Sequence, residues 1–181
     1  ALCLLPAATM NAQENMERLW ERAARLEAQA LPRQAMQVAD SILALSLADG
    51  NLPQEVRAII YRTRMSASFE EDPYLAAYGF IAERASSAQG QRRSLLLSLL
   101  AEVQWRYFMV HMPDILQRTP LTDPGDDLRW WDAATFSRHI RETYLASLEG
   151  EQVLLKVPVR DYSAILDTSS GSEVLRPTLF D

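Results

Sequence analysis

The chain has 181 residues, 48% of them hydrophobic and 23% charged, which is typical of a globular protein long enough to form one domain with a substantial core. Its net charge of −6 disfavours nucleic acid as a partner, because phosphates require a clustered basic surface and the densest basic cluster here is the pair Arg92-Arg93. The most apolar run, residues 95–101, is about a third of the roughly 20 residues that span a bilayer, so we expect no membrane-spanning segment.

Residues 1–12 differ from the rest of the chain because they are apolar and uncharged, a pattern typical of the back half of a secretory signal peptide. We interpret them as a signal peptide remnant and expect an exported protein of the periplasm, outer membrane or cell surface. The alternative is an apolar first turn of a core helix, which Pro6 would interrupt. Cys3 lies in this segment, so the mature protein would contain no cysteine.

Helical spacing begins near Asn15, and the first expected helix ends at Leu31-Pro32. Its apolar face consists of Met16, Leu19, Trp20, Ala23, Leu26 and Ala30. A second helix opens at Pro32 and stops at the turn signal 49–51. Its inward residues are Ala35, Val38, Ala39, Ile42 and Leu43. Two antiparallel helices therefore follow one another over residues 15–49.

The same pattern repeats along the chain. A third helix opens at Pro53, and its expected inward residues are Val56, Ile59, Ile60 and Thr63. Asp72 is the expected N-cap of a fourth helix, which buries Leu75, Tyr78, Ala82 and Ala85. The fifth, over residues 91–110, is apolar around much of its circumference, and Met112-Pro113 is expected to end it. A helix of this kind is expected to be central, with Leu99, Leu100 and Val103 nearly inaccessible.

The first, third and fifth helices begin about 38 residues apart, within the range of about 34 to 47 residues that helical repeats show. We therefore predict an all-α fold, an irregular array of antiparallel helix pairs with a tetratricopeptide-like helical-repeat architecture, over residues 13–172. Arrays of this kind have grooves suited to binding peptides or partner domains.

The pattern changes after residue 118. Residues 118–129 form an acidic loop, and Asp132 is the expected N-cap of a sixth helix with Phe136, Ile140, Tyr144 and Leu148 inward. Residues 153–159 are expected to be extended, with a short helix at 161–166 and a Ser/Gly link at 168–172. Residues 173–181 are apolar in part, and we interpret them as the start of a junction to a following domain.

Candidate catalytic and binding residues are few. His111 and His139 lack a nucleophile motif, and His139 with Glu142 gives one half, in reversed order, of a di-metal pattern. A calcium loop formed by Asp123, Asp126 and Asp127 would have irregular ligand spacing and no late glutamate, so a solvated acidic loop is favoured. Trp105, Trp130 and Trp131 form either a sugar-binding platform or, as we favour, part of the core. We expect no catalytic, cofactor-binding or metal site.

Short clusters lie along nearly the whole mature chain, the most specific being the final heptad at 175–181, Leu-Arg-Pro-Thr-Leu-Phe-Asp. The others are Trp20 with 30–35, then 50–54, 70–72, 99–102 before Trp105 and Tyr107, Arg118-Thr119, Trp131-Asp132 and 144–148. Together they resemble the helical N-terminal region of large secreted bacterial alpha-2-macroglobulin-like proteins. In that family the sequence continues past the heptad into another helix and the macroglobulin domains.

The resembled family traps proteases through a bait segment and, in many members, a Cys-x-Glu-Gln thioester. The mature chain has no cysteine for a thioester, so the resemblance implies a non-catalytic accessory or docking domain of the inhibitor. The expected partners are other proteins or downstream domains of the same chain. The alternative is a free-standing helical-repeat adaptor that binds peptides or partner proteins in the cell envelope.

Overall fold

The computed structural model describes residues 6–165 and 176–180, and within them it confirms an all-helical fold with no strand. The helices are α1 (Pro6–Ala28), α2 (Pro32–Ala48), α3 (Leu52–Ser66), α4 (Pro73–Ser87), α5 (Gly90–Ile115), α6 (Ala133–Ser147) and α7 (Glu151–Leu154), with 3-10 turns η1 (Leu128–Trp130) and η2 (Val159–Tyr162). The expected Ser/Gly link at 168–172 and residues 1–5 lie outside the described part.

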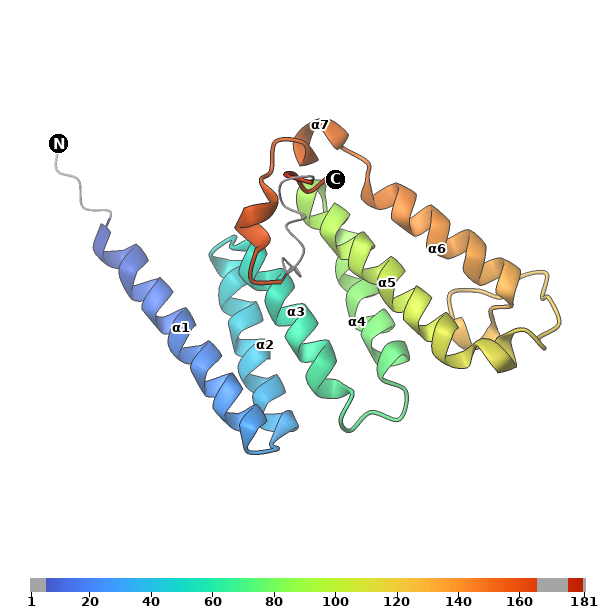
Figure 1. Ribbon diagram of the computed structural model, residues 1–181, viewed down its shortest axis with the longest axis horizontal. Coiled ribbons are helices and arrows are strands. Elements are labelled where there is room, and N and C mark those ends of the chain that lie inside the picture. Colours follow the sequence, from blue (N-terminus) through green and yellow to red (C-terminus); the bar gives the residue numbers. More distant parts are fainter. Residues whose placement is uncertain (1–5, 166–175, 181) are drawn as a thin grey trace. The chain divides into compact units, whose positions relative to one another are not determined.

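The chain divides between Glu71 and Asp72 into two units, which we describe separately as unit 1 (residues 1–71) and unit 2 (residues 72–181). In unit 1, α1 packs on α2 and α2 on α3; in unit 2, α4 packs on α5 and α5 on α6. Short turns join successive helices within each unit, except α5 and α6, which are joined by a longer loop that contains η1, and neighbouring helices run antiparallel (Figure 1). Each unit therefore has a central helix, α2 in the first and α5 in the second.

The core of unit 1 follows the predicted apolar pattern of its central helix. All five residues that the sequence placed inward on α2 are buried, and Ser46 joins them by donating a 2.8 Å hydrogen bond to the carbonyl of Ile42. The prediction for α3 is confirmed for Val56 and Ile59 but wrong for Ile60. Ile60 is exposed because the residue after Ile59 is turned about 100° away from the buried face of the helix.

α1 and α2 end in the same hydrogen-bonded motif. The N–H of Leu31 donates to the carbonyl of Leu26 at 2.9 Å, and that of Asn51 donates to Ser46 at 2.8 Å. The residue before each donor is left-handed, Ala30 with φ of 55° and Gly50 with φ of 64°. Such an end usually carries glycine, because a Cβ is strained in this conformation. Ala30 therefore holds a position for which glycine is the better residue.

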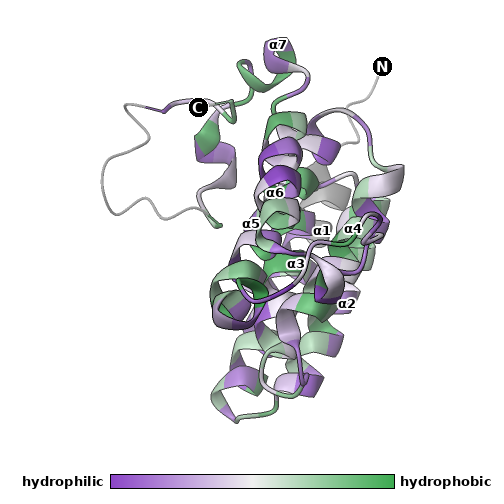
Figure 2. Cartoon of the chain, turned by 90° about the vertical axis from the view of Figure 1, so that its right-hand side faces the viewer, coloured by the Kyte–Doolittle hydropathy of each residue, from purple (hydrophilic) through white to green (hydrophobic). Residues whose placement is uncertain are grey.

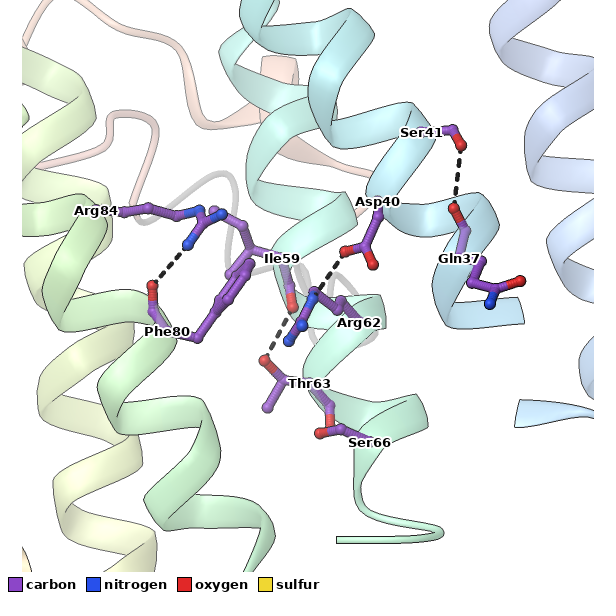
Figure 3. A network of polar contacts seen from close by, with 9 residues as sticks. All are labelled: Gln37, Asp40, Ser41, Ile59, Arg62, Thr63, Ser66, Phe80 and Arg84. Atoms are coloured by element: carbon purple, nitrogen blue, oxygen red, sulfur yellow. Dashed lines mark hydrogen bonds and ion pairs between the residues drawn. The ribbon is translucent and has the colours of Figure 1, made fainter. Parts of the chain in front are cut away.

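Polar and aromatic side chains join the first and last helices of unit 1. Tyr61 of α3 has its hydroxyl 3.0 Å from Oε2 of Glu27 on α1, and the Tyr61 ring packs edge-on against Trp20 at 5.5 Å. The guanidinium of Arg57 lies over the Trp20 ring, 4.0 Å from its centroid. Between α2 and α3, Nε of Arg62 donates to Oδ1 of Asp40 at 2.8 Å (Figure 3). These contacts fix how α1 and α2 lie against α3.

Unit 2 is built around α5, as its apolar sequence predicted. Leu100 and Val103 are buried, whereas Leu99 is half-buried. The predicted caps are confirmed: Asp72 accepts from the N–H of Leu75 at 3.0 Å at the start of α4, and Asp132 accepts from Thr135 at 2.8 Å at the start of α6. Carboxylates at these positions satisfy amides that have no partner within the helix.

Two helix boundaries and the exposure of one residue of α5 differ from the predictions. α1 begins at Pro6 and not near Asn15, because proline fits the first turn of a helix, where its missing N–H has no partner to lose. α5 continues through Pro113 to Ile115, since a proline this close to the end removes only the bond to the carbonyl four residues back. Val110 is exposed, so α5 is not apolar on every side.

The segment expected to be extended at 153–159 is partly helical. α7 includes the first two residues of this segment, and its N-cap Gly150 is in the left-handed conformation. The sequence did not reveal α7, because a single helical turn is too short to produce a recognisable period. The remainder pairs with the end of the chain: the N–H of Val159 donates to Pro177 at 2.9 Å, and that of Leu179 donates to Val157 at 3.0 Å. An isolated antiparallel bridge joins Pro158 to Thr178.

Candidate functional site

The two histidines weighed as catalytic candidates both lie in unit 2 and both pack on aromatic rings. His111 has its ring 4.3 Å from that of Tyr107, and its Nε2 is 3.5 Å from Oδ2 of the capping residue Asp72. His139 stacks on Trp131 at 4.2 Å, and its pKa is lowered by burial and then by the neighbouring Arg138. Among the described residues, the contacts of these histidines are with aromatic rings and, for His111, with Asp72, and no hydrogen bond joins either histidine to a serine or cysteine.

The acidic loop weighed as a calcium site is organised by its own protein contacts. Asp127 accepts three hydrogen bonds from the side chain of Arg129, at 2.7, 3.0 and 3.1 Å, and this guanidinium is the main cause of its lowered pKa. Asp123 accepts from the N–H of Gly125 at 3.2 Å. Within residues 6–165 and 176–180, no group of three or more His, Cys, Asp or Glu side chains is gathered as metal ligands would be.

A buried tryptophan and an arginine hold the loop against unit 2. Nε1 of Trp131 donates to the carbonyl of Gly125 at 2.8 Å, and the guanidinium of Arg118 donates to the carbonyls of Leu128 and Trp131 at 3.1 and 2.7 Å. Trp131 is 1% exposed and packs edge-on against Phe136 at 5.2 Å. The loop is therefore tied to the core at three points.

The three tryptophans of unit 2 do not form a common platform. The core prediction is confirmed for Trp131 but wrong for Trp130 and Trp105, which are 60% and 45% exposed. Trp130 lies in η1, whereas Trp105 lies on α5 and stacks with Phe108 at 5.9 Å. Among the described rings, no contact joins Trp105 to either of the other two.

Trp105 instead lines an apolar groove between α5 and α6, which we call the α5/α6 groove. Its volume is about 290 Å³, and its lining comprises Trp105 and Phe108 from α5 with Ser137, Ile140 and Arg141 from α6. Phe108 and Ile140 also pack against the aromatic core of unit 2, so the floor of the groove is continuous with that core. A rigid, packed floor preserves the shape of the groove when a ligand binds.

A polar bridge joins the two helices close to the groove. The hydroxyl of Tyr144 on α6 donates to Oε2 of Glu102 on α5 at 3.2 Å, and Oε1 of Glu102 accepts from Nε of Arg106 at 2.6 Å. Burial raises the pKa of Tyr144, and the charge of Glu102 raises it further. The carboxylate of Glu102 is thereby fully engaged within the protein.

Apolar side chains continue outward from the groove along both helices. Met109, one turn beyond Trp105, is 46% exposed, and Leu145, one turn beyond Arg141, is 61% exposed. Leu148, the C-cap of α6, was predicted to face inward but is 41% exposed. Green, hydrophobic segments therefore alternate with purple, hydrophilic ones along both ribbons (Figure 2).

The groove was missed by sequence reasoning because its signal is the same as that of a core. Trp105, Met109 and Met112 recur at spacings of four and three, which places them on one helical face. A face of this kind is normally buried against a neighbour, whereas here part of it extends past α6. The exposed Arg141 within the apolar face of α6 was the available hint.

Comparisons with protein-family models, with curated proteins and with solved structures found no match for this chain. None of the described helices has the length and apolar character needed to cross a membrane.

Proposed function

We propose that this chain is a non-catalytic helical docking domain, and that it serves as the N-terminal accessory domain of a bacterial alpha-2-macroglobulin-like envelope protein in a family of protease-trapping inhibitors. The docking role is supported by one observation above all, the exposed apolar α5/α6 groove. The family assignment is supported by the sequence clusters that end in the heptad at 175–181. Export to the envelope is a proposal that rests on the composition of residues 1–12.

The groove supports docking because large apolar side chains remain exposed beside a packed floor. Trp105 and Met109 are each almost half exposed, although burying such side chains fully would be worth about 1.5–3 kcal/mol each. Clustered exposure of this kind marks interaction surfaces more often than scattered single residues do. A partner that covers the groove would gain this apolar burial without having to rearrange unit 2.

The helical-repeat adaptor is the second candidate, and the same groove favours it. The two differ in what the gene encodes after Asp181. Macroglobulin domains downstream would establish the accessory-domain proposal, whereas a stop codon at that point would refute it in favour of the adaptor.

The docking role is tested by site-specific photo-crosslinking in the cells that produce the parent protein. A photoreactive amino acid replaces Met109, which lies one helical turn from Trp105 of the groove, and the matched control replaces Val110, which is similarly exposed but points about 100° further around the same helix. We expect a discrete crosslinked species from position 109 and none from position 110. Equal crosslinking from both positions, or none from either, would contradict docking at this groove.

A further inference from the structure

We propose that the α5/α6 groove binds a segment of a partner protein that carries apolar side chains next to a carboxylate, with Trp105 and Ile140 contacting the apolar side chains and Arg141 pairing with the carboxylate. This inference rests on the proposed docking function and adds the chemistry of the partner.

The size and composition of the groove select for side chains rather than for a whole small molecule. Its volume of about 290 Å³ lies at the lower limit of the roughly 300–1,000 Å³ of small-molecule pockets. Met109 and Leu145 are exposed one helical turn from Trp105 and Arg141, toward opposite ends of the groove because α5 and α6 run antiparallel. A chain of anchors that continues along the helices would cover all of this surface, whereas one compact ligand would leave most of it in water.

The charge of the groove selects for an acidic group. Arg141 is the one ionisable residue of the lining, and no carboxylate of the described residues lies within ion-pairing distance of its guanidinium. On the facing helix α5, the carboxylate of Glu102 is already engaged, since it pairs with Arg106 and accepts a hydrogen bond from the hydroxyl of Tyr144. A guanidinium beside an apolar surface suits a carboxylate, with which it forms two parallel hydrogen bonds.

The charge of the whole chain limits how acidic the partner is. With a net charge of −6, the protein repels a strongly acidic tract at long range. A single carboxylate flanked by apolar residues meets only the local attraction of Arg141. The geometry therefore favours an amphipathic segment with one acidic residue on its apolar face.

The form of the occupant follows from the direction of the surface. Trp105 and Met109 on α5 are four residues apart, as are Arg141 and Leu145 on α6, so the exposed contacts are arranged along the two helix axes. Helical ligands present anchors at the same spacing when they lie in a groove. We therefore infer a helical segment lying along α5 and α6.

The test uses the full chain and three synthetic peptides of about 16 residues, long enough to form a helix, on an uncharged alanine/glutamine background. The first carries two leucines four residues apart and a glutamate on the same face. The second has lysine in place of the glutamate, and the third has alanines in place of the leucines. Binding is measured by calorimetry and by the NMR signal of the Trp105 indole.

We expect the leucine/glutamate peptide to bind, the lysine peptide to bind about fivefold more weakly, and the alanine peptide not to bind. Arg141→Glu should reverse the preference between the first two peptides, whereas Arg138→Glu, an exposed charge outside the groove lining, should leave it unchanged. Trp105→Ala should weaken binding by at least about tenfold, in contrast to Trp130→Ala. Both tryptophan variants are checked for helicity first.

The alternative outcomes are distinguishable. Equal binding of the glutamate and lysine peptides, lost in Trp105→Ala, would overturn the acidic partner but retain a docking groove. A dimer in analytical ultracentrifugation that Trp105→Ala dissociates would assign the groove to a second copy of the chain and overturn the inference. Absence of binding by all three peptides would also overturn it, while the crosslinking from Met109 tests the docking role independently.

Discussion

Replacing Ala30 by glycine is expected to stabilise unit 1, and replacing Gly50 by alanine is expected to destabilise it. The two residues occupy the same position of the same helix-ending motif, at φ of 55° and 64°. A left-handed conformation costs a residue with a Cβ about 1–2 kcal/mol. Glycine also lowers stability by about 0.4–1 kcal/mol, because it has more conformational freedom in the unfolded chain, and this offsets part of the relieved strain. The expected change in the free energy of unfolding is therefore close to +0.8 kcal/mol for Ala30→Gly, with the opposite sign for Gly50→Ala.

No packing effect complicates this comparison. Ala30 is exposed, so its methyl group makes no buried contact, and a Cβ built at Gly50 has no atom within 4 Å. Urea unfolding followed by circular dichroism measures both variants, and the double variant serves as the control because distant changes should add to nearly zero. A destabilised Ala30→Gly variant with an unchanged m-value would refute the reasoning, since it would show that the left-handed strain at Ala30 is smaller than the conformational freedom that glycine adds to the unfolded chain.

Three further predictions follow from the packing and charges of the two units. Leu100→Ala should lower the free energy of unfolding by about 2–5 kcal/mol because Leu100 is buried on the central helix of unit 2, whereas Val110→Ala should cost less than about 0.5 kcal/mol; chemical denaturation measures both. Asp132→Ala should cost about 1 kcal/mol at neutral pH through loss of the α6 cap. Because the folded pKa of Asp132 is lowered, mainly by Thr135, this cost should vanish as the pH falls below about 4 through the folded pKa; a cost that persists at low pH would contradict a charged cap. Burial and Glu27 raise the pKa of Tyr61 to about 12. Tyr61 therefore contributes stability that is complete below its unfolded pKa of about 10 and is lost as the pH rises to about 12. A tyrosinate absorbance titration of the wild type and of Tyr61→Phe should show this group titrating last, and its titration at about 10 would disprove the contact.

Local signals in the sequence predict most of the helices and their caps. Asp72 and Asp132 precede apolar periodic segments, and a short acidic side chain there has few roles other than accepting from the first free amides. Proline is less decisive, because its effect depends on position. Pro6 and Pro113 were expected to break helices and instead lie at the first and last turns, where proline costs little.

The groove could not be predicted, because the sequence records which helical face is apolar but not how much of that face a neighbour covers. Trp105 and Trp131 both continue apolar patterns, yet one is 45% exposed and the other is buried. Trp131 lies just before the start of α6 and packs against Phe136, whereas Trp105 lies on α5 at the groove between α5 and α6. Residue 105 thereby lies at the edge of the covered area, which is a property of the packed pair of helices.

The four tryptophans of the chain occupy four different surroundings, which gives the protein a built-in set of optical reporters. Trp20, the single tryptophan of unit 1, lies beneath the guanidinium of Arg57 and donates to Oε1 of Gln54 at 2.7 Å. Trp130 is open to solvent, Trp105 faces the groove, and Trp131 is enclosed. With the three tryptophans of unit 2 replaced by phenylalanine, the remaining emission would follow unit 1 alone. Loss of unit 1 can then be timed separately from loss of unit 2, so the coupling between the two units becomes measurable from fluorescence.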